Sequence, residues 1–154
     1  MTSPRPDHGD LIDIGPGGVV SRALGRAARQ HRNLAAELLK AAGLYPGQEL
    51  LMMHLWNAGA VRQADLIQGL GVDPSTVTKM LSRLERAGHV TRTTDPADRR
   101  AMLVEATPAS RALRPEIEDA WAALEDRTVA GLDAAERDQL RHLLAKVETG
   151  LCQA

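Results

Sequence analysis

Residues 74–87, PSTVTKMLSRLERA, combine a regular apolar pattern with a dense set of polar and basic side chains. The apolar residues recur three and four positions apart, which predicts a helix with one buried face. They are Val77, Met80, Leu81 and Leu84. The other face carries Ser75, Thr76, Thr78, Lys79, Ser82, Arg83 and Arg86. Hydroxyl groups and the N–H groups of a helix N-terminus can approach phosphate closely, and Lys and Arg bind phosphates or guanine acceptors. This face therefore has the chemistry of a DNA contact, and an ordinary solvated helix face is the alternative.

A second basic cluster, at residues 98–100, lies between two segments that have the pattern of β-strands. Residues 89–94 alternate in polarity, residues 101–105 are mostly apolar, and DPAD at 95–98 supplies turn residues, so a β-hairpin is predicted. A narrow DNA minor groove attracts arginine, so we expect Arg99 and Arg100 to contact the minor groove and phosphates. Asp98 is expected to orient an arginine through a charge-assisted hydrogen bond. The alternative is a charged tip that keeps a sheet edge soluble.

Capping residues place the helices that must hold these two clusters. Residues 63–70 predict a short helix, Asp73 is an N-cap candidate, and Pro74 suits the first position of the next helix. Two helices joined by a glycine-containing turn form a helix-turn-helix, and the hairpin completes a winged helix. Helices are also predicted over 19–42, 46–59, from Thr107–Pro108 to about 130, and after the cap Asp133.

The fold class is therefore mainly α with a small β-hairpin wing. A flexible N-terminal arm is expected over residues 1–17, and a single domain over 18–154. Within that domain, residues 45–106 form the winged-helix DNA-binding lobe, and residues 18–44 and 107–154 are long flanking dimerisation helices. The last helix carries an apolar stripe that favours packing against a second subunit. The stripe consists of Leu140, Leu143, Leu144, Val147 and Leu151.

Composition limits the remaining function classes. The net charge of −1 predicts no partner by itself, and residues 112–154, with nine acidic and five basic side chains, are not expected to face DNA. No signal-peptide pattern and no apolar run of about 20 residues occurs, so a cytoplasmic protein without a membrane partner is expected. No enzyme is expected, because HExxH, P-loop, GxSxG and paired-carboxylate patterns are absent.

The segment VDPSTVTKMLSRLERAGHVTRTTDPADRRAMLVEATP, residues 72–108, resembles the MarR family (multiple antibiotic resistance regulators). The resemblance covers roughly residues 20–150. It implies a homodimer joined through its terminal helices and bound to double-stranded DNA at a pseudo-palindromic operator, usually as a repressor. It places Asp98 and Arg100 at the family's wing pair, with Arg100 in the minor groove. It also places Ser75, Thr76, Thr78, Lys79 and Arg83 at recognition-helix positions. A winged-helix protein-interaction module is the alternative, but the basic helix face and the arginines of the wing argue against it.

The resemblance also implies an effector pocket, because ligands of the family often lodge between the first, second and fifth helices. The candidate lining residues are His31, Met53, His54, Trp56 and Trp121. A Met and Trp cluster that belongs to the core is the alternative. No cofactor is expected to be required, and the effector class stays open between a small aromatic ligand and zinc. The histidines at 31, 54, 89 and 142 show no i,i+3 or i,i+4 pairing, so no metal ligand is assigned.

The single cysteine, Cys152, cannot form an intrachain disulfide. Such a residue usually behaves as a small hydrophobe, with a redox sensor as the alternative. The oxidant-sensing members of the resembled family use a cysteine in the first helix, where this chain has none. A peroxide sensor is therefore not expected.

Overall fold

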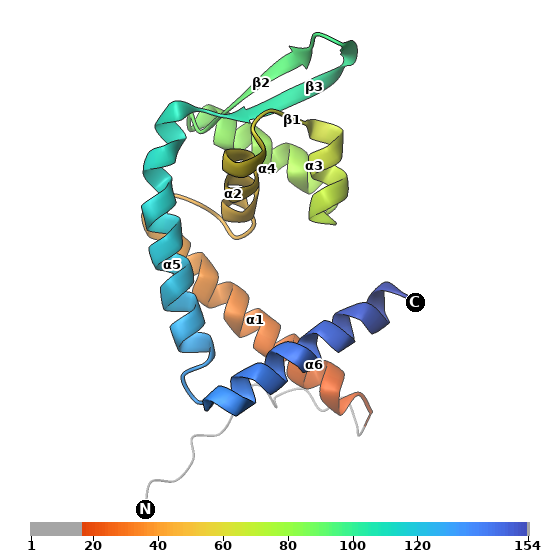
Figure 1. Ribbon diagram of the computed structural model, residues 1–154, viewed down its shortest axis with the longest axis vertical. Helices are drawn as coiled ribbons and strands as arrows, with labels where there is room; N and C mark the ends of the chain where they lie inside the picture. The colour runs from red at the N-terminus through yellow and green to blue at the C-terminus, as the bar shows by residue number, and fades with distance from the viewer. Residues whose placement is uncertain (1–16, 154) are drawn as a thin grey trace, which may run out of the picture.

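The computed structural model describes residues 17–153, so the arm expected at the N-terminus lies outside the described residues except for Gly17. Figure 1 shows a winged-helix lobe at one end and long helices extending away from it. This confirms a mainly α fold with a small wing and long terminal helices. In chain order the elements are α1 (Val19–Leu39), η1 (Lys40–Ala42), α2 (Gln48–Ala58), β1 (Val61–Arg62), α3 (Gln63–Leu70), α4 (Pro74–Arg86), β2 (Val90–Asp95), β3 (Asp98–Ala106), η2 (Pro108–Ala112), α5 (Leu113–Thr128) and α6 (Ala134–Cys152).

The wing is a three-stranded antiparallel sheet in the order β1-β3-β2, rather than the two-stranded hairpin expected from the sequence. The missed strand, β1, pairs Val61 with Val104 and Arg62 with Leu103. Two residues are too few to show the alternation that reveals a strand. Strand β3 also begins at Asp98, so Arg99 and Arg100 belong to the strand and not to the turn. The register of β2 and β3 shifts here, between the pairs Thr94–Met102 and Asp95–Asp98, so both arginines lie at an irregular part of the wing.

The core of the lobe lies where α2, α3, α4, α5 and the wing meet. All four apolar residues expected on the inner face of α4 are buried. They join Leu51 and Met52 of α2, Val104 of β3 and Ile117 of α5, each with no exposed surface. Complete burial of one such side chain is worth about 1.5–3 kcal/mol, so this cluster sets the position of α4.

Two helix starts differ from the sequence-based boundaries. Helix α2 begins at Gln48 and not at Pro46, because Gly47 adopts a left-handed conformation with φ of 97°. The helix expected from Pro108 opens as the 3-10 helix η2, in which the Ser110 hydroxyl donates to the Thr107 carbonyl at 2.6 Å. The Thr107 hydroxyl accepts the Ser110 N–H at 3.2 Å, as expected for a cap. At α6 the side chains and backbone of Asp133 and Glu136 form a capping box.

The long helices leave a large apolar surface uncovered in the single chain. Helix α1 packs against α5 and diverges from it toward α6 (Figure 1), whereas no residue of α6 is buried. The exposed apolar side chains of these two helices are Val19, Val20, Leu24, Leu140, Leu143, Leu144, Val147 and Leu151. Exposed apolar side chains in this number along two helices are typical of an interaction site.

Candidate nucleic-acid interface

The N-terminus of α4 is held by Asp73. Its carboxylate accepts the N–H of Thr76 at 3.2 Å and the hydroxyl hydrogen of Ser75. The Ser75 hydroxyl, and after it the Thr76 N–H, holds the pKa of Asp73 below its usual range. The sequence predicted this cap. The cap also uses one of the N–H groups that were predicted from the sequence to bind phosphate. The helix N-terminus therefore has fewer free backbone donors for DNA.

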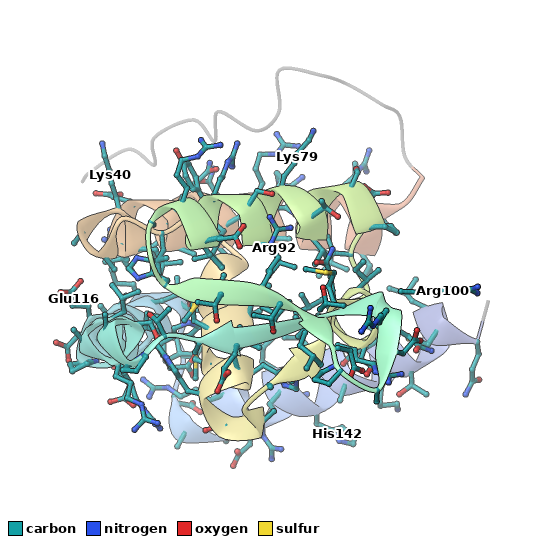
Figure 2. All side chains as sticks on the ribbon, turned by 90° about the horizontal axis from the view of Figure 1, so that it is seen from above. Lys40, Lys79, Arg92, Arg100, Glu116 and His142 are labelled. Carbon is teal, nitrogen blue, oxygen red and sulfur yellow. The ribbon has the colours of Figure 1, made fainter. Side chains whose placement is uncertain are left out.

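The outer face of α4 is polar along its whole length. The Thr78 hydroxyl donates to the Pro74 carbonyl at 2.9 Å, and the Ser82 hydroxyl donates to the Thr78 carbonyl at 3.0 Å. These bonds fold both side chains against the helix and leave their oxygen atoms as acceptors. The side chain of Lys79 points outward from this face (Figure 2).

The basic side chains of this region carry uncompensated charge. Within residues 17–153, no carboxylate forms an ion pair with Lys79, Arg83, Arg86, Arg99 or Arg100. All five are exposed. The helix and the wing therefore present a set of unneutralised cations, although the net charge of the chain is slightly negative.

Arg92 joins α4 to the wing. Its Nη2 and Nε lie 2.6 and 3.0 Å from Oε2 of Glu85, and Nη2 also reaches Oγ of Ser82 at 3.4 Å. The hydrogen bond from Arg92 lowers the pKa of Glu85. Figure 2 shows Arg92 between α4 and the strands. Because its charge is already paired, Arg92 fixes the relative placement of α4 and β2 instead of adding a free cation.

A second ion pair fixes the turn of the wing. Nη2 of Arg62 in β1 lies 2.7 Å from Oδ2 of Asp95, whose Oδ1 accepts the N–H of Ala97 at 2.8 Å. The Ala97 N–H, followed by Arg62, lowers the pKa of Asp95. Asp98 was expected to bond an arginine side chain, but its Oδ1 accepts the backbone N–H of Arg100 at 3.1 Å. The Arg100 side chain extends freely from the wing (Figure 2).

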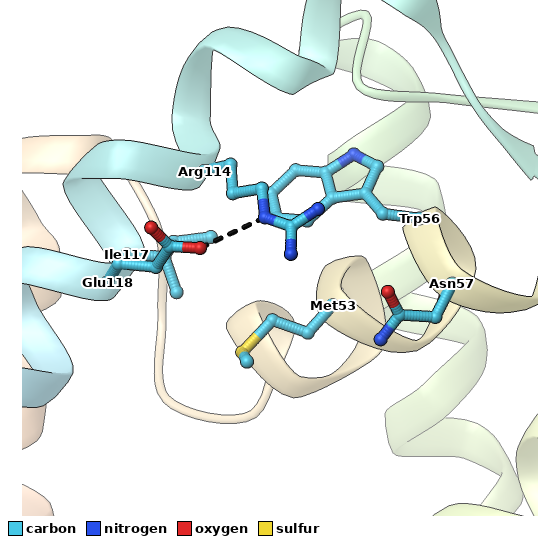
Figure 3. A pocket seen from close by; sticks show the side chains of 6 residues that line it. All are labelled: Met53, Trp56, Asn57, Arg114, Ile117 and Glu118. Atoms are coloured by element: carbon cyan, nitrogen blue, oxygen red, sulfur yellow. Dashed lines mark hydrogen bonds and ion pairs between the residues drawn. The ribbon is translucent and has the colours of Figure 1, made fainter.

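A small pocket lies between α2 of the lobe and α5 (Figure 3). It is partly open to solvent, and its lining residues are Met53, Trp56, Asn57, Arg114, Ile117 and Glu118. Nε of Arg114 lies 3.0 Å from Oε1 of Glu118. Nε1 of Trp56 donates to the buried Ser110 hydroxyl at 2.9 Å, so its ring is held at one side of the pocket.

The pocket contains only two of the five residues proposed from the sequence, Met53 and Trp56. His31 and His54 are exposed, Trp121 is 38% exposed, and none of these three lines the pocket. The sequence did not single out Arg114 and Glu118, because an i,i+4 pair of opposite charges is typical of a solvated helix face.

Three further features bear on the expectations from sequence. In the described part of the chain, no three His, Cys, Asp or Glu side chains gather as a metal ion would require. Cys152 is exposed near the end of α6. Among residues 17–153 there is also no helix with the length and apolar character needed to cross a membrane.

A helix-turn-helix with an arginine-bearing wing defines the winged-helix class of DNA-binding proteins. The model of the MarR family matches residues 44–102. The fold resembles BpsR of Bordetella bronchiseptica, with 30% identity, 87% of this chain and 98% of that chain covered, and a TM-score of 0.77. That structure concerns regulation of DNA binding by 6-hydroxynicotinic acid. This chain belongs to the MarR family of winged helix-turn-helix, DNA-binding transcriptional regulators, which are not enzymes.

Two further relatives extend the comparison. A cysteine-to-serine mutant of MarR from E. coli, solved in complex with operator DNA, is 26% identical with a TM-score of 0.76, covering 83% of this chain and 92% of that one. The regulator MgrA of Staphylococcus aureus is 28% identical over 126 residues, which are 81% of this chain and 84% of MgrA. These similarities extend well beyond the winged helix and include the long helices.

Proposed function

We propose that this chain is a repressor that binds a pseudo-palindromic operator as a homodimer, with α4 in the major groove and the wing at the adjacent minor groove. The observation that carries the proposal is the set of unpaired cations on α4 and β3, which the Arg92–Glu85 pair holds in a fixed relation. Ser75, Thr76, Thr78, Lys79 and Ser82 face the bases, and Arg83 and Arg86 bind phosphates. The operator complex of E. coli MarR supports this mode, because that protein shares the fold.

The two arginines of the wing have different tasks. Arg99 and Arg100 are consecutive in β3, next to the turn of the wing, and both side chains are exposed. Arg100 enters the minor groove, and Arg99 contacts a phosphate beside it. Asp98 supports this by holding the backbone at Arg100.

The homodimer rests on the uncovered apolar side chains of α1 and α6. Leu143 is 48% exposed and Leu151 is 68% exposed, although both belong to the stripe of α6. A second copy of the chain covers these residues and sets the distance between two recognition helices. Residues 45–106 then act as the DNA-binding lobe, and residues 18–44 and 107–154 as the dimerisation part.

The experiment that tests this function combines selection and titration. DNA that the full chain retains from a random pool would be sequenced, and the best duplex titrated by fluorescence anisotropy with and without random competitor. We expect an inverted repeat and a complex of two chains per duplex by light scattering. A selected pool without a repeat, or one chain per duplex, would contradict the operator model.

A pair of variants on α4 tests how the operator is read. Lys79→Ala is expected to reduce the preference for operator over random DNA, because Lys79 reaches base acceptors. Arg86→Ala, the matched loss of one charge near the end of the helix, should weaken binding to both duplexes equally. If both variants lose the same affinity for both duplexes, Lys79 does not contact the bases.

We propose that the pocket between α2 and α5 receives the effector, a small aromatic acid. The Trp56 ring and Met53 supply apolar walls, and Arg114 supplies a cation for a carboxylate. An exposed ion pair such as Arg114–Glu118 is worth only about 0–1 kcal/mol, so a ligand carboxylate can displace Glu118. BpsR, a relative of similar fold, is regulated in its DNA binding by 6-hydroxynicotinic acid, which is a small aromatic acid.

The effector proposal is tested by DNA titration with 6-hydroxynicotinic acid, with benzoic acid, with zinc and with a chelator. Either acid should weaken operator binding by the wild type. Operator binding by the Arg114→Gln variant should be the same with and without the acid. Arg111→Gln removes a nearby cation that does not line the pocket, and this variant should respond as the wild type does. A response to zinc alone would replace the aromatic acid by a metal effector.

A further inference from the structure

Tyr45 is a large aromatic side chain at the surface of the lobe, next to the proposed recognition helix. It lies in the turn before α2 and is 61% exposed, so it contributes little to the core. The Cζ atom of Arg83, on α4, lies over its ring at 5.1 Å from the centroid. This distance is within the range of about 6 Å in which a guanidinium is attracted to the face of an aromatic ring.

The turn that carries Tyr45 is fixed at several points. The N–H of Tyr45 donates to Oε1 of Gln48 at 2.9 Å, and the N–H of Gly47 donates to Oε2 of Glu49 at 2.7 Å. Both acceptor side chains belong to buried residues. A Cβ atom placed on Gly47 would lie 3.5 Å from Sδ of Met80, so the turn also lies directly against α4. The position of the Tyr45 backbone is therefore set relative to the helix that carries Arg83.

The charge of Arg83 remains available while its orientation is restricted. No carboxylate pairs with Arg83 in the described region, in contrast to Arg92 on the neighbouring strand. The ring of Tyr45 attracts the guanidinium but does not neutralise its charge, so Arg83 can still bind a phosphate. A long side chain that is already ordered loses less conformational freedom when it binds.

We propose that Tyr45 is a positioning residue of the DNA interface, which holds the Arg83 guanidinium ready for a phosphate contact. The inference rests on the DNA-binding face proposed above and adds to it a residue outside the helix-turn-helix and the wing. The ring acts through Arg83, and the Tyr45 hydroxyl takes no part.

The test is a double-variant cycle on the selected operator duplex and on a random duplex at low salt, followed by fluorescence anisotropy. Tyr45→Leu should weaken both complexes about three- to tenfold, which corresponds to the ordering of one long side chain. Tyr45→Phe keeps the ring and should bind within twofold of the wild type. In the Arg83→Ala background Tyr45→Leu should have no effect, whereas in the Arg86→Ala background its full effect should remain.

Each other outcome overturns the inference in a recognisable way. Equal losses for Tyr45→Phe and Tyr45→Leu would show a direct contact by the hydroxyl. A loss that persists without Arg83 would show that the ring acts independently. If Arg83→Ala binds as tightly as the wild type, the proposed face is itself wrong at that residue. If Arg83→Ala is weakened and Tyr45→Leu is not, the face stands and only the role of Tyr45 fails.

Discussion

The hydrogen bond between Trp56 and Ser110 connects the DNA-binding lobe to the long helices, and its removal should measurably weaken the fold. Trp56 is in α2 and Ser110 is in η2, at the entry to α5. Ser110 has no exposed surface, and the Nε1–Oγ distance is 2.9 Å. Trp56→Phe keeps most of the ring and removes the donor. We expect a loss of about 1–2 kcal/mol, from a net hydrogen bond of about 0.5–1.5 kcal/mol and a smaller apolar contact.

The companion variant Ser110→Ala separates the bond from the packing. The Ser110 hydroxyl also donates to the Thr107 carbonyl at 2.6 Å, so this variant removes two hydrogen bonds. The two single variants should be non-additive by about 0.5–1.5 kcal/mol, because both delete the same Trp56–Ser110 bond.

The assay is urea unfolding at one fixed protein concentration, since the stability of the proposed homodimer would depend on concentration. The slope of the unfolding free energy against urea should be unchanged in the variants. Additive effects of Trp56→Phe and Ser110→Ala would refute this reasoning and would mean that the two residues contribute separately.

Three further changes probe the core, a buried carboxyl group and the apolar stripe. Leu81→Ala in the fully buried face of α4 should lower the unfolding free energy by about 2–5 kcal/mol, and a smaller loss in the same urea assay would show that the site collapses. Burial raises the pKa of Glu49 in the folded protein above its pKa in the unfolded chain. The contribution of Glu49 to the free energy of unfolding therefore falls as the pH rises through the interval between these two pKa values. Glu49→Gln keeps an acceptor for the Gly47 N–H. The melting temperature of this variant minus that of the wild type should be larger at pH 7 than at pH 4. A difference that does not change with pH would contradict this. Leu144→Glu in the stripe of α6 should give a folded monomer by light scattering and circular dichroism, and an unchanged dimer would place the interface elsewhere.

The sequence was most informative where neighbouring residues determine the structure. Asp73 and Pro74 mark the start of α4, and the spacing of the four apolar residues identifies its buried face, because both signals come from one short segment. The wing was found for the same reason, through its turn residues and flanking β-branched residues. The third strand of the wing was not found from the sequence, since β1 has only two residues and is defined by its pairing with β3.

The contacts that organise the site join residues far apart in the chain. Arg62 and Asp95 are 33 residues apart, and nothing in either local segment indicates the other. Tyr45 and Arg83 likewise meet only through tertiary packing. Two of the six residues that line the pocket, Met53 and Trp56, were proposed from the sequence, because apolar side chains of this size indicate an interior wall. Arg114 of α5 resembles an ordinary surface residue until the packing of α2 against α5 is known.

The most direct test of the proposed DNA-binding face is an anisotropy titration of the selected operator duplex with wild type, Arg100→Ala and Arg127→Ala. Arg127 is an exposed cation near the far end of α5, away from the lobe, so this control removes the same charge elsewhere. Arg100→Ala should weaken binding by about 1–3 kcal/mol, while Arg127→Ala should bind within twofold of the wild type. Equal affinities for Arg100→Ala and the wild type, or equal losses in the two variants, would contradict the placement of the wing on the DNA.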